Sequence, residues 1–394
     1  MVLNRRSLPF EVPEYSLTGD VVSFSRCALQ YRYYNGSSLP PSRPVQLWTG
    51  EFVHGVLEEA YRYWQINNTP FPWPCNPTPW PPPPTLPIRT AHDIGVLGDL
   101  VETRLSAAGK NPRSRDARDF AYSRVDAAIN MLGQHLFPLI TAAEFRISGT
   151  RKMPQTLGAG NPTRGDRYEL TGVIDVISSV VANAHPTNPL VQMIGPITAS
   201  AGTDFDVIVD YKAARRPPIN DTHWDLEEWQ VQTYAWLCMR VPQRPIGAGI
   251  LVYINELVPS RTDLEHLRRE ILNGTTDVIP ANGTPDYYAL HRWQPNQGNP
   301  LPTFSTGYLL QRAIRIVDVS HVQVQHAVNQ IDQVVGKIEL SVVNENNTGD
   351  IPSNWNATGV DQDCTACDFK HFCPDPYSRR QNPNAPVSPP PAPG

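Results

Sequence analysis

Three cysteines stand close together in the sequence DCTACDFKHFC (363–373), at the spacing C-x2-C-x5-C. Cys364, Cys367 and Cys373 offer three thiolates, whereas a tetrahedral zinc ion or a [4Fe–4S] cluster takes four ligands. In a reducing compartment, clustered cysteines are more typical of metal or cluster ligands than of disulfides. The pattern therefore predicts a metal or cluster site whose fourth ligand lies elsewhere in the chain.

Two apolar segments each carry one aspartate: GVIDVI (172–177) contains Asp175, and VIVDYKAA (207–214) contains Asp210, followed two residues later by Lys212. A carboxylate is costly to bury unless it is paired or binds a metal. Side chains alternate along a strand, so Asp210 and Lys212 share a face, and Asp175 joins them if the strands pair. Two carboxylates and a lysine fit a hydrolytic Mg²⁺ or Mn²⁺ site. A strand-end ion pair between Asp210 and Lys212 is the alternative.

Hydrophobic periodicity and turn residues indicate the elements that position these residues. Helices are expected at 21–34, 47–64, 92–107, 118–136, 225–240, 261–273 and 319–340, and strands at 142–148, 167–181, 205–214 and 247–256. Three strands, a helix and a further strand, with helices before them, predict an α/β fold with a mixed central sheet flanked by helices.

Composition narrows the class of protein. Proline is concentrated at 69–87, which predicts an extended segment, and in the tail 376–394, which is expected to be disordered. The net charge of −5 argues against a protein that coats nucleic acid with its whole surface, so such contact would be confined to a groove. No apolar run has the length of a membrane span and no signal peptide is evident, so we expect a cytoplasmic protein without membrane contact.

Taken in order, these motifs resemble the RecB-type branch of the PD-(D/E)XK nucleases. The resemblance adds His54, in GEFVHGVLEEAY (50–61), and the sequence QVQTY (230–234), whose Gln230 and Tyr234 share one helical face. It implies a restriction-endonuclease-like fold. It also implies roles for six residues: metal ligands His54, Asp175 and Asp210, a water-positioning Lys212, and Gln230 and Tyr234 that position the lysine or the DNA backbone. On their own, His54, Gln230 and Tyr234 are also compatible with an ordinary helix-flank histidine, a polar edge residue and a core aromatic.

Four further residues are candidates near this set. Glu144, on the strand before Asp175, could be a ligand or a solvated strand-end glutamate. Single-stranded DNA binding needs cations along the backbone, and Arg215 and Arg216 in KAARRPP (212–218) and Arg32 in QYRYY (30–34) could supply them. A solvated turn for Arg215 and Arg216, and core packing for the tyrosines beside Arg32, are the alternatives.

The iron–sulfur subset of the same branch has a lone cysteine before the helix histidine. This subset includes the RecB-like nucleases of CRISPR adaptation, exonuclease V and the AddB nuclease domain. The sequence SFSRCALQYRYY (23–34) offers Cys27, with Ala28 where the family has proline. The resemblance thus implies a structural [4Fe–4S] cluster held by Cys27, Cys364, Cys367 and Cys373. Structural zinc on the same four cysteines, or no ligand at all, are the alternatives.

The resemblance covers about 20–65, 140–255 and 360–375, and it leaves 69–90, 182–204 and 256–360 as insertions in one domain, 1–375. The expected function is hydrolysis of DNA, by an exonuclease or end-processing nuclease that acts on single strands or DNA ends. Candidate partners are a helicase or CRISPR-adaptation proteins. A DNA-binding or scaffold subunit of a repair or defence complex that does not cleave, and a nuclease for RNA, are the alternatives.

Overall fold

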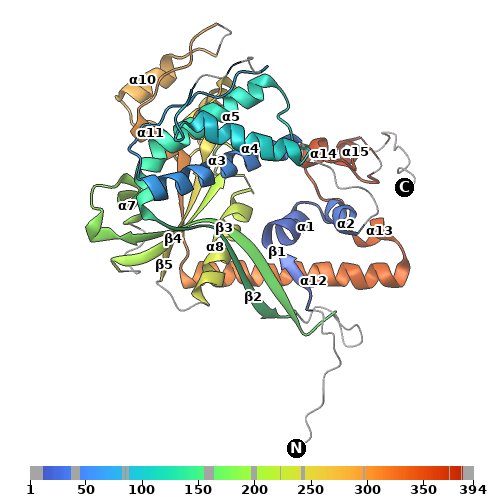
Figure 1. Cartoon of the computed structure of the whole chain (residues 1–394). Coiled ribbons are helices and arrows are strands. Elements are labelled where there is room, and N and C mark those ends of the chain that lie inside the picture. The colour runs from blue at the N-terminus through green and yellow to red at the C-terminus, as the bar shows by residue number, and fades with distance from the viewer. Residues whose placement is uncertain are drawn as a thin grey trace, which may run out of the picture. The chain divides into compact units, whose positions relative to one another are not determined.

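The computed structural model describes residues 12–36, 45–81, 85, 88–154, 164–196, 202–221, 223–240, 245–295, 298–371, 373–382 and 384. They form a mixed α/β structure with an open mixed sheet flanked by helices (Figure 1). The chain divides into two compact units: unit 1 comprises Met1–Ser42, Arg146–Val173 and His321–Gly394, and unit 2 comprises Arg43–Phe145 and Ile174–Ser320. Within the described ranges, no helix combines the length and apolar character needed to cross a membrane.

The sheet of unit 2 is built around β4, whose residues 205–211 are all buried. β4 pairs antiparallel with the last part of β3 and parallel with β5, and β5 pairs antiparallel with β6. Parallel neighbours and complete burial require cover on both faces, which explains why β4 is almost continuously apolar. The expected mixed sheet is confirmed. Among the described residues the whole sheet has six strands. Four of them are β3 (Arg167–Val181), β4 (Asp204–Lys212), β5 (Ile246–Tyr253) and β6 (Ile314–Val317), and β1 (Glu14–Ser16) and β2 (Ile140–Lys152) both pair with β3.

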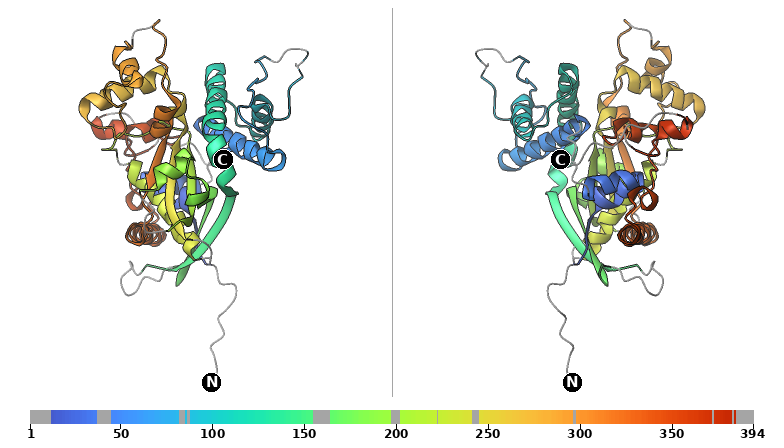
Figure 2. Two further views of the ribbon diagram at one scale, coloured as in Figure 1. Left: turned by 90° about the vertical axis from the view of Figure 1, so that its left-hand side faces the viewer. Right: turned by 90° about the vertical axis from the view of Figure 1, so that its right-hand side faces the viewer.

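Helices pack on both faces of this sheet. On one face, Val53 and Val56 of α3 share a core with Val207 and Val209 of β4, and α4 and α5 lie beside α3 (Figures 1 and 2). On the other face lies α8. It lies so close to β5 that a Cβ at Gly249 would stand only 2.1 Å from the Val231 side chain, so the glycine permits this approach. The helices are α3 (Val45–Asn67), α4 (Ile94–Ala107), α5 (Arg115–Ala127) and α8 (His223–Met239).

The proline-rich segment is extended, as expected, and its described part from residue 69 to 80, the proline strap, is tightly anchored in unit 2. Trp73 is buried, and its main-chain N–H and carbonyl bond to the side chain of Asn130 at 2.7 and 3.0 Å. The Asp93 carboxylate accepts the Asn76 main-chain N–H at 2.8 Å. A Cβ at Gly95 would stand 2.2 Å from the Asn76 carbonyl carbon, so only glycine lets α4 approach the strap.

Unit 1 is held together by buried carboxylates on its long helix α12. Glu339 is completely buried and accepts hydrogen bonds from Arg164, at 2.8 and 2.9 Å, and from the Tyr15 hydroxyl. Asp332 accepts from the Tyr168 hydroxyl at 2.7 Å. These bonds tie α12 to β1, to the first part of β3 and to the chain before it. The elements are β1 (Glu14–Ser16), α1 (Ser23–Arg26), α2 (Ala28–Gly36) and α12 (His321–Thr348).

The expected elements are largely present, and β3 and α9 (Arg261–Asn273) have the predicted bounds. The single helix predicted at 21–34 is wrong, because Cys27 has extended backbone, φ −159° and ψ 109°, and separates α1 from α2. The helix predicted at 118–136 is divided by a π-helical turn before α6 (Gln134–Leu136). The strand predicted at 142–148 is longer, as β2 (Ile140–Lys152).

Several short elements have no clear periodicity and were not expected. Besides β1 and β6 they are α7 (Pro189–Ile194), α10 (Pro285–Arg292), α11 (Thr306–Ala313), α13 (Ile351–Asn354) and α14 (Asp361–Ala366). Within the tail expected to be disordered, α15 (Tyr377–Gln381) is helical, and the tail from residue 385 lies outside the described residues. Residues 197–201 of the polar segment 182–204, and 82–84, 86 and 87 of the proline-rich segment, also lie outside them.

The contact between Gly95 and the strap gives a stability prediction. Gly95→Ala places a methyl group against the Asn76 main chain, and the overpacking should lower the free energy of unfolding by about 1–3 kcal/mol. Urea denaturation followed by circular dichroism measures the change. Gly50→Ala is the matched control, since a Cβ there meets nothing within 4 Å and alanine is the better helix former by about 1 kcal/mol. Equal midpoints for the two variants would contradict the prediction.

Candidate functional site

The strands β3 and β4 part at one point of unit 2. Their last pair is Val176 opposite Val209, one position before Asp175 and Asp210 would face each other. Beyond it, Asp175 Oδ2 accepts the main-chain N–H of Tyr211 at 2.7 Å, in place of a neighbouring strand. The aspartate therefore lies between the two strands because its side chain satisfies a donor that the end of the ladder leaves free.

His54 of α3 meets the same point from the adjacent helix. Its Nε2 lies 2.9 Å from the carbonyl oxygen of Tyr211, and its Nδ1 lies 3.4 Å from Asp175 Oδ1. Burial lowers the pKa of the His54 imidazole, but the charge and hydrogen bond of Asp175, together with Asp210, raise it to about 9. The imidazole is thus a counter-ion of the carboxylates. A divalent cation that displaced its proton could fill the same role.

Asp210 and Lys212 form a buried ion pair on the other face of β4. Lys212 Nζ lies 2.6 Å from Asp210 Oδ2 and donates to Gln230 Oε1 at 2.9 Å. The Gln230 amide donates to Asp210 Oδ1 at 3.1 Å and to the Tyr234 hydroxyl at 3.2 Å. Four of the residues expected to work together therefore form one hydrogen-bonded network. α8 supplies its glutamine and tyrosine from one helical face.

The charges of this network follow from its burial. Asp210 is 3% exposed, and burial raises its pKa to about 6; Asp175 adds to the rise and Lys212 opposes it. Burial alone lowers the pKa of Lys212, but Asp210 and Glu227 outweigh it and raise that pKa. Lys212 is therefore an ammonium ion near neutral pH. Such a group can stabilise negative charge and orient a water molecule, rather than remove a proton.

Glu144 of β2 belongs to this site more closely than the sequence suggests. One ligand atom each from Glu144, His54 and Asp175 lie within 4.8 Å of one another. The same three residues, with Glu58 and Tyr211, line one pocket of unit 2. Burial and the neighbouring Asp175 and Glu58 raise the pKa of the Glu144 carboxyl. The sequence named Glu144 as a candidate but left its role open, because the position of its side chain depends on one backbone angle, φ +49°, that no periodicity predicts.

Two of the arginines expected to contact DNA are used inside unit 2. Arg216 is 4% exposed, forms an ion pair with Asp277 and donates to the Ile314 carbonyl at 2.9 Å. Arg215 forms an ion pair with Glu270 of α9. These arginines attach the insertion after residue 256 to the end of β4. A DNA contact by Arg216 is contradicted by its burial, and Arg215 already has an acidic partner.

Arg32, the third expected cation, has a similar position in unit 1. Its guanidinium binds the Glu345 carboxylate of α12, with Nε 2.6 Å from Oε2. The Trp355 indole donates to the same carboxylate at 2.7 Å. Tyr31 packs at 6.0 Å between ring centroids from Trp355, as expected for a core tyrosine. Arg32 therefore anchors α2 to α12, and we do not assign it a contact with DNA.

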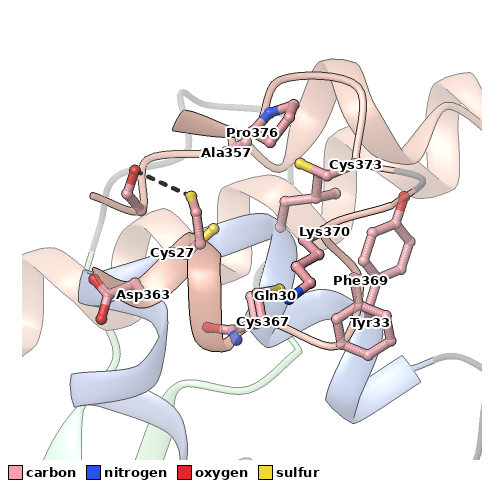
Figure 3. A pocket seen from close by; sticks show the side chains of 13 residues that line it. Cys27, Gln30, Tyr33, Ala357, Asp363, Cys367, Phe369, Lys370, Cys373 and Pro376 are labelled. Atoms are coloured by element: carbon pink, nitrogen blue, oxygen red, sulfur yellow. Dashed lines mark hydrogen bonds between the residues drawn. The ribbon is translucent and has the colours of Figure 1, made fainter. Parts of the chain in front are cut away.

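The four cysteines of the expected cluster line a single pocket in unit 1 (Figure 3). Cys27 comes from the break between α1 and α2, Cys364 from α14, and Cys367 and Cys373 from the loop that follows. Figure 3 shows Tyr33 and Phe369 together beside this pocket, and their ring centroids are 5.1 Å apart. Cys75 and Cys238 belong to unit 2 and do not line this pocket.

Hydrogen bonds that involve the main chain hold the cysteine segments against each other. The Leu29 N–H bonds to the Asn356 carbonyl at 3.2 Å and the Thr358 hydroxyl to the Arg26 carbonyl at 3.3 Å, on either side of Cys27. The Tyr377 N–H points at Cys364 Sγ, 3.3 Å away.

The thiols of this pocket influence one another's ionisation. Burial raises the pKa of Cys367 to about 11, and the other three cysteines add to the rise. Four thiols that repel one another when ionised make a suitable site for a cation that replaces their protons.

Comparison with known proteins adds no identification. No protein-family model matches the chain, and none of the curated proteins is significantly similar to it. The interpretation of both sites therefore depends on the residues and geometry described above.

The buried network predicts unequal effects of two variants. Gln230→Ala removes hydrogen bonds from both Lys212 and Asp210, and it should lower the free energy of unfolding by about 1–3 kcal/mol. Tyr234→Phe removes one hydroxyl at 3.2 Å from the Gln230 amide, and it should cost about 0.5–1.5 kcal/mol. Chemical denaturation gives both values. A Tyr234→Phe variant that is less stable than Gln230→Ala would show that the amide does not organise the network.

Proposed function

We propose that this protein is a metal-dependent deoxyribonuclease with a restriction-endonuclease-like core of the RecB-type PD-(D/E)XK class. The observation that carries the proposal is the meeting of α3, β3 and β4 at Tyr211. There, His54 and Asp175 bond to the main chain of β4, between the positions of Asp210 and Lys212. That the motif residues which suggest this class lie close together in unit 2 supports the proposal.

The donor atoms fit a divalent cation. Asp175 offers carboxylate oxygens, Tyr211 a carbonyl oxygen and His54 an imidazole nitrogen. For Asp210 to join them, as the resemblance implies, its carboxylate would exchange its bonds to Lys212 and Gln230 for the cation. Oxygen donors of this kind suit Mg²⁺ or Mn²⁺. A cation bound by these residues would lower the pKa of a water molecule and neutralise charge on a phosphodiester.

The chain's own residues would do the positioning. Gln230 and Asp210 hold the Lys212 ammonium in one place, so that it can orient the attacking water and stabilise negative charge on the phosphate oxygens. The Tyr234 hydroxyl accepts a hydrogen bond from the Gln230 amide and so helps to fix its position. Because the ion pair is almost fully buried, these interactions are stronger than they would be in water.

DNA, as a single strand or at a duplex end, is the proposed substrate, in line with the resemblance of the motifs. A helicase or CRISPR-adaptation proteins are the proposed partners, and the cytoplasm is the proposed location. The acidic net charge of −5 fits a substrate path confined to a groove rather than a broad basic surface.

We further propose that Cys27, Cys364, Cys367 and Cys373 hold a structural [4Fe–4S] cluster. All four line one pocket and belong to the same unit, although they come from segments far apart in the sequence. Four cysteine thiolates are a complete ligand set for such a cluster. The cluster would fasten α2 to the segment after α12, and it has no part in hydrolysis because no electron is transferred.

A cleavage assay tests the nuclease. Protein purified without oxygen is incubated with end-labelled single-stranded DNA, duplex DNA or RNA, in Mn²⁺ or in EDTA. Asp210→Ala and Lys212→Ala should each reduce metal-dependent DNA cleavage about 10²-fold or more. Lys110→Ala, which removes a lysine paired with Glu51 in the same unit, should cleave like the wild type.

The outcomes of this assay are distinct. Full activity in Lys212→Ala or Asp210→Ala would sink the assignment. DNA binding without cleavage in any metal would instead indicate a scaffold subunit. Cleavage of RNA alone would change the proposed substrate from DNA to RNA. In each variant, circular dichroism and iron content should match the wild type, so that lost activity is not lost structure.

Metal and sulfide analysis tests the cluster. The wild type, purified anaerobically, should contain about four iron and four sulfide per chain and absorb near roughly 400 nm, where thiolate-to-iron charge transfer is expected. Cys27→Ser should lose most of the iron and the absorption band. Cys75→Ser, which changes a cysteine of unit 2, should keep both. One zinc and no iron per chain would replace the cluster by structural zinc.

A further inference from the structure

Glu144 has an unusual backbone conformation for its position. It lies within β2, yet its φ is +49°, in the left-handed region. Apart from glycine, Asn68 is the only other described residue with a positive φ, and asparagine tolerates that conformation far better than glutamate does. Residues held in sparsely populated conformations concentrate at functional sites. The conformation of Glu144 directs its side chain toward His54 and Asp175.

The surroundings of its side chain point to a cation. Ligand atoms of Glu144, His54 and Asp175 lie within 4.8 Å of one another, a separation that one metal ion can span. The set combines an imidazole with two carboxylates, and the Tyr211 carbonyl oxygen lies 2.9 Å from the same imidazole. Glu144 is exposed, and within the described ranges its carboxylate has no hydrogen bond or ion pair of its own.

The neighbouring Glu58 differs from Glu144 because it has a cationic partner. It lines the same pocket as Glu144 and lies one turn after His54 on α3. Its carboxylate forms an ion pair with Arg62 on the same helix, so its charge is already compensated. Glu144 interacts with Asp175 and with the His54 imidazole instead, and a divalent cation that displaced the His54 proton would neutralise both carboxylates.

We propose that Glu144 is a ligand of the divalent cation, together with His54 and Asp175. This inference rests on the proposed function and extends its site. The ion would then be held by three elements, α3, β2 and β3, near the Asp210–Lys212 ion pair of β4. Two carboxylates and an imidazole on one side of β4 would bind Mn²⁺ before any DNA arrives.

Calorimetric titration with Mn²⁺ tests this ligand without relying on activity. The full-length, cluster-loaded protein is freed of divalent ions and titrated without DNA at fixed pH and salt. Glu144→Gln should weaken Mn²⁺ binding at least tenfold. Glu58→Gln, the matched control from the same pocket, should stay within twofold of the wild type. Asp175→Asn should lose most of the binding.

The variants separate failure of this inference from failure of the function. Wild-type affinity in Glu144→Gln, with binding lost in Asp175→Asn, would overturn the role of Glu144 and leave the nuclease untouched. No Mn²⁺ binding by the wild type at millimolar concentration would also overturn the inference, while DNA cleavage judges the function separately. Should Glu144→Gln fail to fold, Glu144→Asn takes its place, because asparagine accepts the left-handed conformation.

Discussion

The hydrogen bond from the Tyr211 N–H to Asp175 is the interaction on which the site of unit 2 depends. β3 and β4 are paired up to Val176 and Val209, and continued pairing would have consumed the main-chain groups of Tyr211 on that side. Because the ladder ends there, the Tyr211 N–H binds Asp175 and the Tyr211 carbonyl oxygen lies against His54. The parting of two strands thus leaves main-chain and side-chain polar atoms free to gather at one point of unit 2.

The second constraint is the burial of charge on the central strand. The side chains of Asp210 and Lys212 are largely buried, so their charges and hydrogen-bonding groups must be satisfied by other protein groups. Gln230 is suited to this task, because one amide can accept from the ammonium and donate to the carboxylate. It can do so only if α8 lies close to the sheet, and the absence of a side chain at Gly249 permits this. The close packing that Gly249 permits is therefore also what allows Gln230 to bond to the buried ion pair.

The sequence allowed the long elements and the candidate site to be predicted, for different reasons. β3 and α9 combine strong periodicity with clear ends, so their bounds are as predicted. Asp175, Asp210 and Lys212 could be predicted because charged residues in apolar strands are costly and therefore conspicuous. The structure brings these residues together in unit 2, and it brings the four cysteines together around one pocket.

The features that sequence reasoning missed depend on contacts or on single backbone angles. β6 has only four residues and is defined by its pairing with β5 rather than by its own pattern. The break at Cys27 and the reversed φ of Glu144 each involve one residue, which no periodicity can report. Arg216 resembled a surface cation because its partner Asp277 is 61 positions away. Long-range pairing of this kind is invisible to local analysis.

The division of the chain has a consequence for the order of folding during synthesis. Every candidate catalytic residue belongs to unit 2, which is complete once the ribosome has passed Ser320. Unit 1 needs α12 and the three cysteines that follow it, so its N-terminal helices must wait for the last-made segment. Domains generally fold as they emerge. The nascent chain would thus bring the residues of the candidate site in unit 2 together before its four clustered cysteines could meet, and the cysteine pocket would be the last part of the structure to form.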